Sequence, residues 1–402
     1  MTSPARYPWA VLAHAVFLQL AAYTVRPTAS YRALELGVEP ALLGLVVASF
    51  SLLPLAAAVW VGRMDDAGHG RPLLLVGALL MVGSGVGLLL ATPDVWWLLG
   101  WNALLGLGHL ISLLGEQSRI AEAAAASGRW RNLDALFGLY TFAGSAGQAL
   151  APTLLAVVGG GSVLPETGPL FALYLAAAAC MSATTLWMVV RRSGTRGTRR
   201  TTSIPLRQAL AADPAVRRPL VTSIGVSMMV LCSIDLIQVY LPALGVERGI
   251  PASVVGALLT ARALATMASR LALGRFVDRF GRSGLILWAT AAGAAAVLAV
   301  AVPMPEWALG AVLVAAGYAL GIVQPLTMTV VSLAAPPGTR GTWLAARITA
   351  NRLGQAVIPP AVGLLAAGMG SAGVFTAAGV LLGASAAGWR AARPGRPARS
   401  AR

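Results

Sequence analysis

Twelve long apolar runs dominate this sequence and restrict its possible folds more than any other feature. A helix needs about 20 largely apolar residues to cross the hydrocarbon core of a bilayer. Only 11% of the residues are charged, against about 25% in soluble domains. The sequence therefore predicts an all-α polytopic membrane protein with twelve transmembrane helices. The runs are 8–26, 41–61, 72–91, 95–115, 134–158, 170–190, 219–241, 253–273, 284–303, 307–331, 344–366 and 373–389.

The first run is too long for the apolar region of a cleaved signal peptide, and we expect it to end at Arg26-Pro27. If the chain crosses the membrane at every run, 23 of the 30 arginines flank the side that holds both termini. Only Arg26, Arg32 and Arg248 flank the other side. Because basic flanks stay in the cytoplasm, both termini are predicted to be cytoplasmic, in a cell inner (plasma) membrane. The net charge of +16 thus reflects topology, and nucleic acid is not an expected partner.

All 30 basic residues are arginine. Without lysine the chain supplies neither a Walker-type phosphate loop nor a Schiff-base nucleophile. The three histidines and two cysteines show no metal-ligand spacing. We therefore predict no metal, no cofactor and no enzymatic activity. The bias toward Arg, Ala, Gly and Pro is typical of a GC-rich bacterial genome.

A charged segment occurs twice between the apolar runs. Gly274–Arg282 reads Gly-Arg-Phe-Val-Asp-Arg-Phe-Gly-Arg, and a looser copy with one extra residue covers Gly62–Arg71. Such a duplication indicates two homologous halves. We expect an N-terminal half at 1–190, a linker at 191–218 with a short surface helix over Ile204–Ala212, a C-terminal half at 219–389, and a disordered basic tail at 390–402.

A second repeat lies in the fifth and eleventh runs. Gly147–Pro152 reads Gly-Gln-Ala-Leu-Ala-Pro, and Gly354–Pro359 reads Gly-Gln-Ala-Val-Ile-Pro. Small residues let helices approach closely, and proline bends a helix. We interpret the repeat mainly as helix packing, with bending during transport as an addition. The residues concerned are Gly147, Pro152, Gly354 and Pro359.

The third, sixth, ninth and twelfth runs contain no charged residue, side-chain amide or histidine. They are predicted to be outer, lipid-facing helices. The other runs carry polar groups, which in hydrocarbon must face protein or a water-filled cavity. We predict that some of these groups line a substrate site: Arg352, Asn351, Gln19, Asn102, His109, Gln238 and Gln324.

With these features, the chain resembles the major facilitator superfamily. The resemblance rests on the six-plus-six runs, the basic central segment, and the motif Gly-x-x-x-Asp-Arg-x-Gly-Arg in Gly274–Arg282. The first copy departs from the motif because Ala67 replaces the arginine. The resemblance implies halves related by a pseudo-twofold axis, each built from inverted three-helix repeats, with the substrate near the midplane. It also implies a cytoplasmic gate formed by Gly62, Asp66, Arg71, Gly274, Asp278, Arg279, Gly281 and Arg282.

The two acids of this motif have a physical role in our interpretation. Asp66 is placed to reach the N-terminus of the eleventh helix, and Asp278 that of the fifth, where the helix dipole favours an anion. These contacts would latch the cytoplasmic side in one state and break in the other. For the arginines of the motif the simpler interpretation is that they keep this segment on the cytoplasmic side and so fix the orientation of the helices.

Asp235 is the only acid well inside a predicted run. It lies about 9 Å below the outer end of its helix, and Arg262 lies about 14 Å below the start of the next, at 1.5 Å per residue. We expect the two to pair, either as a structural ion pair or as a proton-coupling site.

Arg352 has no acid nearby in sequence, so an anionic substrate group is a candidate partner. Its alternatives are snorkelling, or binding carbonyls freed near Pro359.

The sequence thus predicts a secondary active transporter that moves a small organic solute by alternating access, coupled to protons, as a monomer in the lipid bilayer. Efflux of a drug-like compound and uptake of an organic acid both stay open, because residues 144–152 match the Gly-Pro-rich antiporter signature poorly. The alternative is a transporter-fold membrane sensor or binding protein without net transport.

Overall fold

The computed structural model describes residues 9–126, 133–190, 214–336 and 339–392, and these ranges contain thirteen α-helices. The first half consists of α1 (Trp9–Glu35), α2 (Gly44–Met64), α3 (Gly70–Leu90), α4 (Val95–Ala126), α5 (Leu133–Val158) and α6 (Gly168–Val190). The second half consists of α8 (Pro214–Arg248), α9 (Ala252–Leu271), the short α10 (Leu273–Phe280), α11 (Arg282–Ala301), α12 (Glu306–Ala334), α13 (Arg340–Leu365) and α14 (Gly370–Ala392). A short 3₁₀-helix, η1 (Pro40–Leu43), precedes α2, and a π-helical segment, η2 (Asp65–His69), follows it.

Each of the twelve apolar runs coincides with one long helix. Within the described residues, eleven of these helices are long and apolar enough to cross a membrane. The exception is α13, whose arginines and asparagine reduce its hydropathy. The all-helical polytopic fold is therefore confirmed, whereas the count of twelve membrane crossings stays a prediction.

The predicted end of the first helix at Arg26-Pro27 is wrong. α1 continues through Pro27 to Glu35, which places Arg26 inside the helix and not in an external loop. Proline is tolerated in buried membrane helices where neighbouring hydroxyl groups bind backbone carbonyls. Thr24 and Thr28 each donate a 2.7 Å hydrogen bond to a carbonyl one turn earlier, at Leu20 and Thr24, on either side of the Tyr23 carbonyl that loses its amide donor at Pro27.

The boundaries near the linker and tail also differ from expectation. α8 begins at Pro214, five residues before the predicted boundary at 219, and α14 continues to Ala392. The helix predicted for Ile204–Ala212 lies outside the described residues, as does the tail beyond Ala392.

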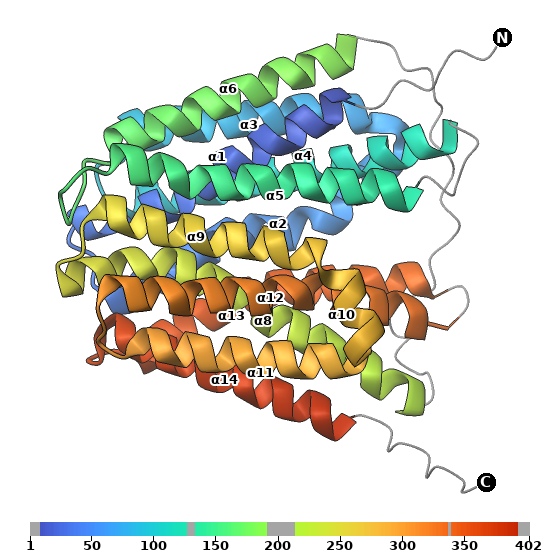
Figure 1. Ribbon diagram of the computed structural model, residues 1–402. Helices are drawn as coiled ribbons and strands as arrows, with labels where there is room; N and C mark the ends of the chain where they lie inside the picture. The colour runs from blue at the N-terminus through green and yellow to red at the C-terminus, as the bar shows by residue number, and fades with distance from the viewer. Residues whose placement is uncertain (1–8, 127–132, 191–213, 337–338, 393–402) are drawn as a thin grey trace, which may run out of the picture.

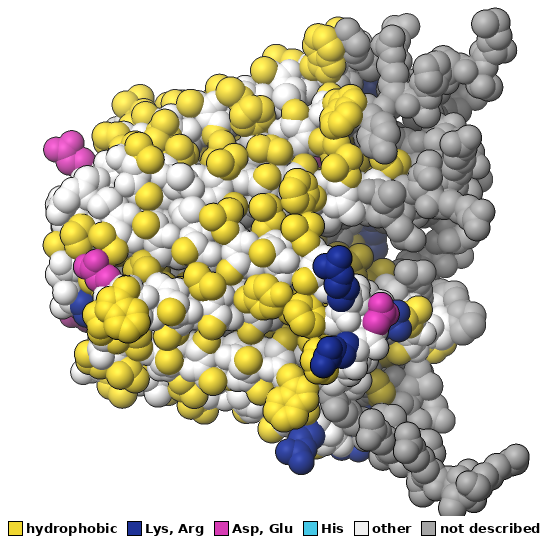
Figure 2. All heavy atoms as spheres, in the orientation of Figure 1, with side chains coloured by type: hydrophobic (Ala, Val, Ile, Leu, Met, Phe, Trp, Pro, Cys, Tyr) yellow, Lys and Arg dark blue, Asp and Glu magenta, His cyan; other side chains and the backbone are white. Residues whose placement is uncertain are grey.

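The two halves lie side by side, α1–α6 above and α8–α14 below in Figure 1. α1 begins and α14 ends at the same end of the molecule, at the right of that view. In Figure 2 hydrophobic side chains cover the middle of the visible face, and basic side chains gather toward this same end. A broad apolar belt between charged ends is the surface that a bilayer requires.

Four helices form the outside of the bundle, and they are the four that carry no charge, amide or histidine in the predicted runs. α3 and α6 pack against each other, as do α11 and α14. Each presents large apolar side chains outward, for example Leu79, Trp187, Trp288 and Val380, all more than half exposed. The remaining long helices surround the interior.

The halves touch most closely at the end away from the start of α1, which we call the closed end. A Cβ added at Gly44 on α2 would lie 2.3 Å from the carbonyl oxygen of Pro359 on α13. A Cβ at Gly256 on α9 would likewise lie 2.3 Å from the backbone nitrogen of Ala156 on α5. Backbone-to-backbone contact of this kind needs glycine and fixes the two halves together at one end.

Gly147 and Gly354 hold equivalent places in the two halves. A Cβ at Gly147 on α5 would lie 2.2 Å from the carbonyl oxygen of Val16 on α1. A Cβ at Gly354 on α13 would lie 2.3 Å from the side chain of Met228 on α8. Each glycine thus packs against the first helix of its own half, on backbone atoms at Gly147 and on a side chain at Gly354, and the bending role of Pro152 and Pro359 stays a prediction.

Candidate functional site

A buried ion pair joins the two halves near the middle of the bundle. Arg26 on α1 donates from Nη1 to Oδ1 of Asp235 on α8, and the two side chains are 12% and 2% exposed. Gln355 on α13 donates from Nε2 to the other carboxylate oxygen. One carboxylate therefore connects α1, α8 and α13, and it has a partner for each oxygen.

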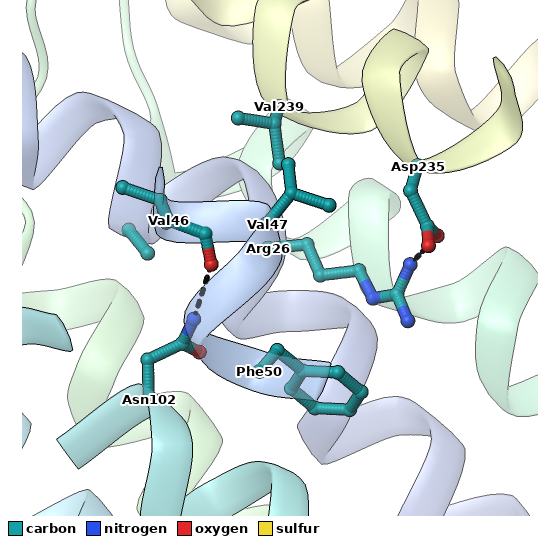
Figure 3. Close-up of a pocket in the computed structure, with 8 residues that line it drawn as sticks. Arg26, Val46, Val47, Phe50, Asn102, Asp235 and Val239 are labelled. Atoms are coloured by element: carbon teal, nitrogen blue, oxygen red, sulfur yellow. Dashed lines mark hydrogen bonds and ion pairs between the residues drawn. The ribbon is translucent and has the colours of Figure 1, made fainter. Parts of the chain in front are cut away.

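Aromatic rings surround the charged end of Arg26. Its guanidinium carbon lies 4.6 Å from the ring centre of Tyr23 and 5.0 Å from that of Phe50, within the range of a cation–π contact. Figure 3 shows Arg26 reaching across to Asp235 with Phe50 beside it. The adjoining cavity measures about 10 Å³, near the least space that holds one water molecule. This part of the site is packed closely and leaves no room for a solute.

The predicted pairing of Asp235 with Arg262 is wrong, because Asp235 pairs with Arg26 instead. The error follows from placing Arg26 in a loop: once α1 is extended, its guanidinium lies at the depth of the carboxylate. Arg262 on α9 is 5% exposed, and its Nε has no hydrogen-bond partner among the described residues.

Arg262 instead borders a larger cavity of about 150 Å³ between the halves, which we call the central cavity. Arg270, two turns further along α9, also lines it and donates from Nη1 to Oγ of Ser145 on α5. None of the described side chains that line this cavity is acidic. Its other lining residues are Tyr23, Gln148, Leu231, Ile234, Ala263, Thr266, Met267 and Gln324.

Gln324 on α12 connects the cavity to a polar network within the second half. Arg347 on α13 donates to Oε1 of Gln324 at 2.6 Å and to its carbonyl oxygen at 3.0 Å. Ser227 on α8 lies 3.2 Å from both Gln324 Oε1 and Asn351 Oδ1. Of the predicted substrate residues, Gln324 thus lies at the cavity wall, while Asn351 lies behind it.

Arg352 lies beside the ion pair and not in the central cavity. Its Nη1 donates to Oε1 of Gln355 at 3.3 Å, and its guanidinium carbon is 6.0 Å from the ring centre of Phe50. Arg352 therefore shares Gln355 and Phe50 with the Arg26–Asp235 pair. Among the described residues, its contacts are with these side chains and not with the carbonyls near Pro359, and an anionic substrate partner stays a prediction.

The predicted polar residues of the first half have mostly structural contacts. Asn102 donates to the carbonyl oxygen of Val46 at 2.7 Å and to Ser49 at 2.9 Å, which ties α4 to α2. Gln19 is buried and its side-chain oxygen accepts a hydrogen bond from Gln148 at 3.3 Å.

His109 is buried with its ring centre 5.5 Å from that of Phe50, and neither ring nitrogen has a hydrogen-bond partner among the described residues. In the second half, the Oε1 of buried Gln238 also lacks one.

A second buried acid was missed at the level of sequence. Glu116 is fully buried because α4 continues past the predicted run at 95–115 to Ala126. Its Oε1 lies 2.5 Å from Nδ1 of His14 on α1, and Tyr140 on α5 donates to its Oε2 at 2.8 Å. His14 Nε2 lies 3.0 Å from Oγ1 of Thr185 on α6. The sequence feature that could have revealed this buried acid is the alanine-rich, helix-forming stretch that follows Gly115.

The repeated charged segments lie in equivalent places of the two halves, one between α2 and α3 and the other between α9 and α11. Gly274–Arg282 is mostly helical, forming α10, and not a loop. Gly281 breaks that helix with φ 69° and ψ 151°, a backbone region that is essentially restricted to glycine. Asp278, Arg279 and Arg282 are exposed, so each faces away from the protein interior.

In the first copy of the segment, Gly62–Arg71, the acid with a described contact is Asp65 and not the predicted Asp66. Ser118 on α4 donates to Oδ2 of Asp65, whereas the side chain of Asp66 lies outside the described residues. Arg71 is exposed, and Gly62 is partly buried on α2. The residues just before α5, which the predicted Asp278 contact involves, also lie outside the description. The predicted latch therefore stays a prediction.

Comparisons with known proteins agree with this architecture. Residues 223–402 match the family model of the Major Facilitator Superfamily. A search of curated protein sequences finds no match. Among solved structures, a bacterial homologue of the human lysosomal transporter Spinster, inward-facing and occupied, has a TM-score of 0.72 at 16% identity and covers 98% of this chain and 97% of its own.

Two further structures show the same fold. The nucleoside transporter NupG has a TM-score of 0.70 at 13% identity, covering 95% of this chain and 97% of its own. A D-xylose–proton symporter has a TM-score of 0.73 at 17% identity, covering 96% and 98%. The second half of the chain thus matches the family model of the Major Facilitator Superfamily, and nearly the whole chain shares the fold of these transporters.

Proposed function

We propose that this protein is a secondary active transporter that moves a small organic solute by alternating access, and not an enzyme. The observation that carries the proposal is the Arg26–Asp235 ion pair, which is buried at the boundary between the two halves. A buried charge pair is costly to desolvate, and it can be broken by adding a proton or a competing ion. Such a contact suits two halves that must separate and reclose.

In this proposal α13 is the twelfth membrane crossing and both termini are cytoplasmic. The long α13 packs against α2 and α8 in the interior of the bundle, where its arginines have protein partners. Its low hydropathy is therefore compatible with a buried transmembrane position. The protein would lie in the plasma membrane as a monomer, with its basic flanks inside.

With the termini in the cytoplasm, the closed end faces outward and the structure represents an inward-facing state. A group of described contacts between the halves at the closed end supports this assignment. They include Thr153 with Thr260 at 3.3 Å and Ala252 N with Ser162 O at 2.9 Å. An inward-facing state would leave the Asp66 and Asp278 latches open, and they would form when the cytoplasmic side closes.

Asp235 is the proposed proton-coupling site, with Arg26 as its partner in place of Arg262. Protonation of the carboxylate would remove the charge that holds Arg26, and the hydrogen bond from Gln355 would lose its anionic acceptor. The three helices that share the carboxylate would then be free to move apart. Proton binding would thereby be linked to the change between the two states.

The experiment is solute flux into proteoliposomes that contain the full chain, with and without an imposed pH gradient. A screen of organic acids, sugars, nucleosides and drug-like cations identifies a transported solute and the direction of movement. We expect the gradient to drive accumulation by the natural protein, and Asp235→Asn to transport without responding to the gradient. Glu166→Gln, a change of an exposed acid, is the matched control.

The competing function is a transporter-fold membrane sensor or binding protein without net transport. It predicts solute binding to the purified protein but no flux against a gradient for any member of the screen. That result would contradict the proposed function. Flux that responds to the pH gradient equally in the natural protein and in Asp235→Asn would contradict the proton-coupling role alone.

A further inference from the structure

The interior between the halves carries far more positive than negative charge. Within the described residues, this interface and the polar network behind it in the second half contain one acid, Asp235, and five arginines, and the Asp235 carboxylate is already bound by Arg26 and Gln355. Burying an uncompensated guanidinium is costly, so such residues are retained where they bind something. The five are Arg26, Arg262, Arg270, Arg347 and Arg352.

The five arginines are not equivalent, because most of them have protein partners. Arg26 binds a carboxylate, Arg347 binds Gln324 and Arg352 binds Gln355. Arg270 has only the hydroxyl of Ser145 among the described residues. Arg262 makes no side-chain hydrogen bond or ion pair with any described residue, although it is only 5% exposed and borders the central cavity.

The surrounding fold holds Arg262 in this position. Gly317 on α12 packs directly against it: a Cβ there would lie 2.2 Å from the Arg262 carbonyl oxygen and 2.9 Å from its Cγ. Thr266 then connects the same two helices, because its hydroxyl lies 3.1 Å from the carbonyl oxygen of Arg262 and 2.9 Å from that of Gly317 and shares its one hydrogen between them. The close helix contact fixes the base of the side chain and leaves its charged end toward the cavity.

Arg262, Thr266 and Arg270 are spaced four residues apart, so they lie along one side of α9. All three line the central cavity, together with uncharged donors from α1 and α5, namely Tyr23, Ser145 and Gln148. The cavity is about 150 Å³, below the roughly 300–1,000 Å³ of drug-sized pockets. Its chemistry is that of a site for a small molecule with a negative charge.

We propose that the central cavity is the substrate site and that it binds a small organic anion, whose carboxylate or phosphate oxygens are held by Arg262 and Arg270. Guanidinium groups match both kinds of anion through paired N–H donors. The uncharged donors from α1 and α5 contact the rest of the solute from the opposite half. Because both halves contribute, the occupied site links solute binding to their relative movement. This proposal rests on the proposed transport function and narrows its substrate class.

The test is binding to the purified full-length protein in detergent, followed by intrinsic tryptophan fluorescence. The probes are lactate, succinate, glycerol 3-phosphate and inorganic phosphate, with chloride and glycerol as the inorganic-anion and neutral comparisons. Comparing the carboxylates, lactate and succinate, with the phosphate compounds shows which of the two anionic groups the site prefers. We expect at least one organic anion to bind in preference to chloride and glycerol. Binding of none, or equal binding of chloride, overturns the proposal.

Arg262→Gln is expected to weaken that binding by about 10- to 100-fold, the factor that corresponds to losing one charge-assisted hydrogen bond. Arg262→Lys keeps the charge but loses the paired donors, so its loss should be smaller. Arg390→Gln, which changes an exposed arginine on α14, should leave binding unchanged. Unchanged affinity in Arg262→Gln overturns the assignment.

Thermal melting distinguishes a binding role from a structural one. Because Arg262 has no partner among the described residues around the cavity, Arg262→Gln should melt at a temperature equal to or above that of the natural protein without ligand. It should also lose the stabilisation that the bound anion gives. A lower melting temperature with retained ligand stabilisation would show a structural role and overturn the proposal.

Failure of this inference differs from failure of the proposed function. If the proteoliposome screen finds flux only of neutral or cationic solutes, the transporter function stands and the anion site is wrong. If no solute moves at all, the transport function itself is contradicted, whatever the purified protein binds.

Discussion

The Arg26 guanidinium on α1 binds the Asp235 carboxylate on α8, so a single buried ion pair joins the two halves within the described part of the protein. Removing one partner of such a pair leaves the other charge uncompensated, at a typical cost of about 3–5 kcal/mol. Asp235→Asn and Arg26→Gln should therefore each lower the melting temperature in detergent.

The double variant Arg26→Gln/Asp235→Asn removes both charges together, so it should melt above either single variant. Glu166→Gln, at an exposed position, should melt as the natural protein does. If the effects of the two single variants simply add in the double variant, the residues are not energetically coupled and the pairing is contradicted.

The buried Glu116 should support the first half independently of the transport site. Its carboxylate contacts His14 at 2.5 Å and Tyr140 at 2.8 Å, and all three side chains are buried. Glu116→Gln keeps the shape but removes the charge, so we expect a loss of about 2 kcal/mol in stability. Thermal melting measures it. An unchanged melting temperature would show that these contacts contribute nothing net to the fold.

The closed end should depend on the absence of a side chain at Gly256. Valine there would collide with the backbone of Ala156, so Gly256→Val should force α9 and α5 apart. We expect increased labelling of a cysteine introduced at the fully buried Ala252, beside the contact, in a chain whose exposed Cys180 is replaced by serine, and reduced solute flux. Gly83→Val on α3 is the matched control, because no described atom lies within 4 Å of the added Cβ. Equal labelling in the two variants would count against this view of the closed end.

Gly281 should be required where α10 meets α11. Its φ of 69° and ψ of 151° lie in a region that costs other residues about 1–3 kcal/mol. Gly281→Ala should therefore lower the melting temperature or displace α10. Gly284→Ala lies three residues further, inside α11 and in open space, so it should be neutral or slightly stabilising. A neutral Gly281→Ala would show that α10 adjusts at no cost.

The helices of this protein were predictable because their signal is local. A run of apolar residues long enough to span hydrocarbon has to be helical, since only a helix satisfies its own backbone in lipid. The position of the outer helices followed for the same reason: the predicted runs of α3, α6, α11 and α14 carry no group that needs a protein partner. The glycines at 147 and 354 were recognised because duplication repeats a packing contact along with its sequence.

The partners of the buried charges were not predictable. Arg26 followed by Pro27 indicated a helix end, yet the helix continues, and that extension moves Arg26 from an external loop to the depth of Asp235. Glu116 was overlooked because hydropathy ends a membrane run before its helix ends. Both errors concern where a helix stops, which depends on tertiary contacts that hydropathy does not include.

The sequence by itself determined the fold class: a chain of long apolar helices, with a second half that matches the family model of the Major Facilitator Superfamily. The tertiary structure decided which charges meet. Asp235 binds Arg26 across the halves, and Arg262 is left beside the central cavity without a partner among the described residues. The physical reason is the distance along the sequence between the residues involved. The length of an apolar run is a property of one helix, whereas an ion pair between residues 26 and 235 forms only after two separate helices have packed.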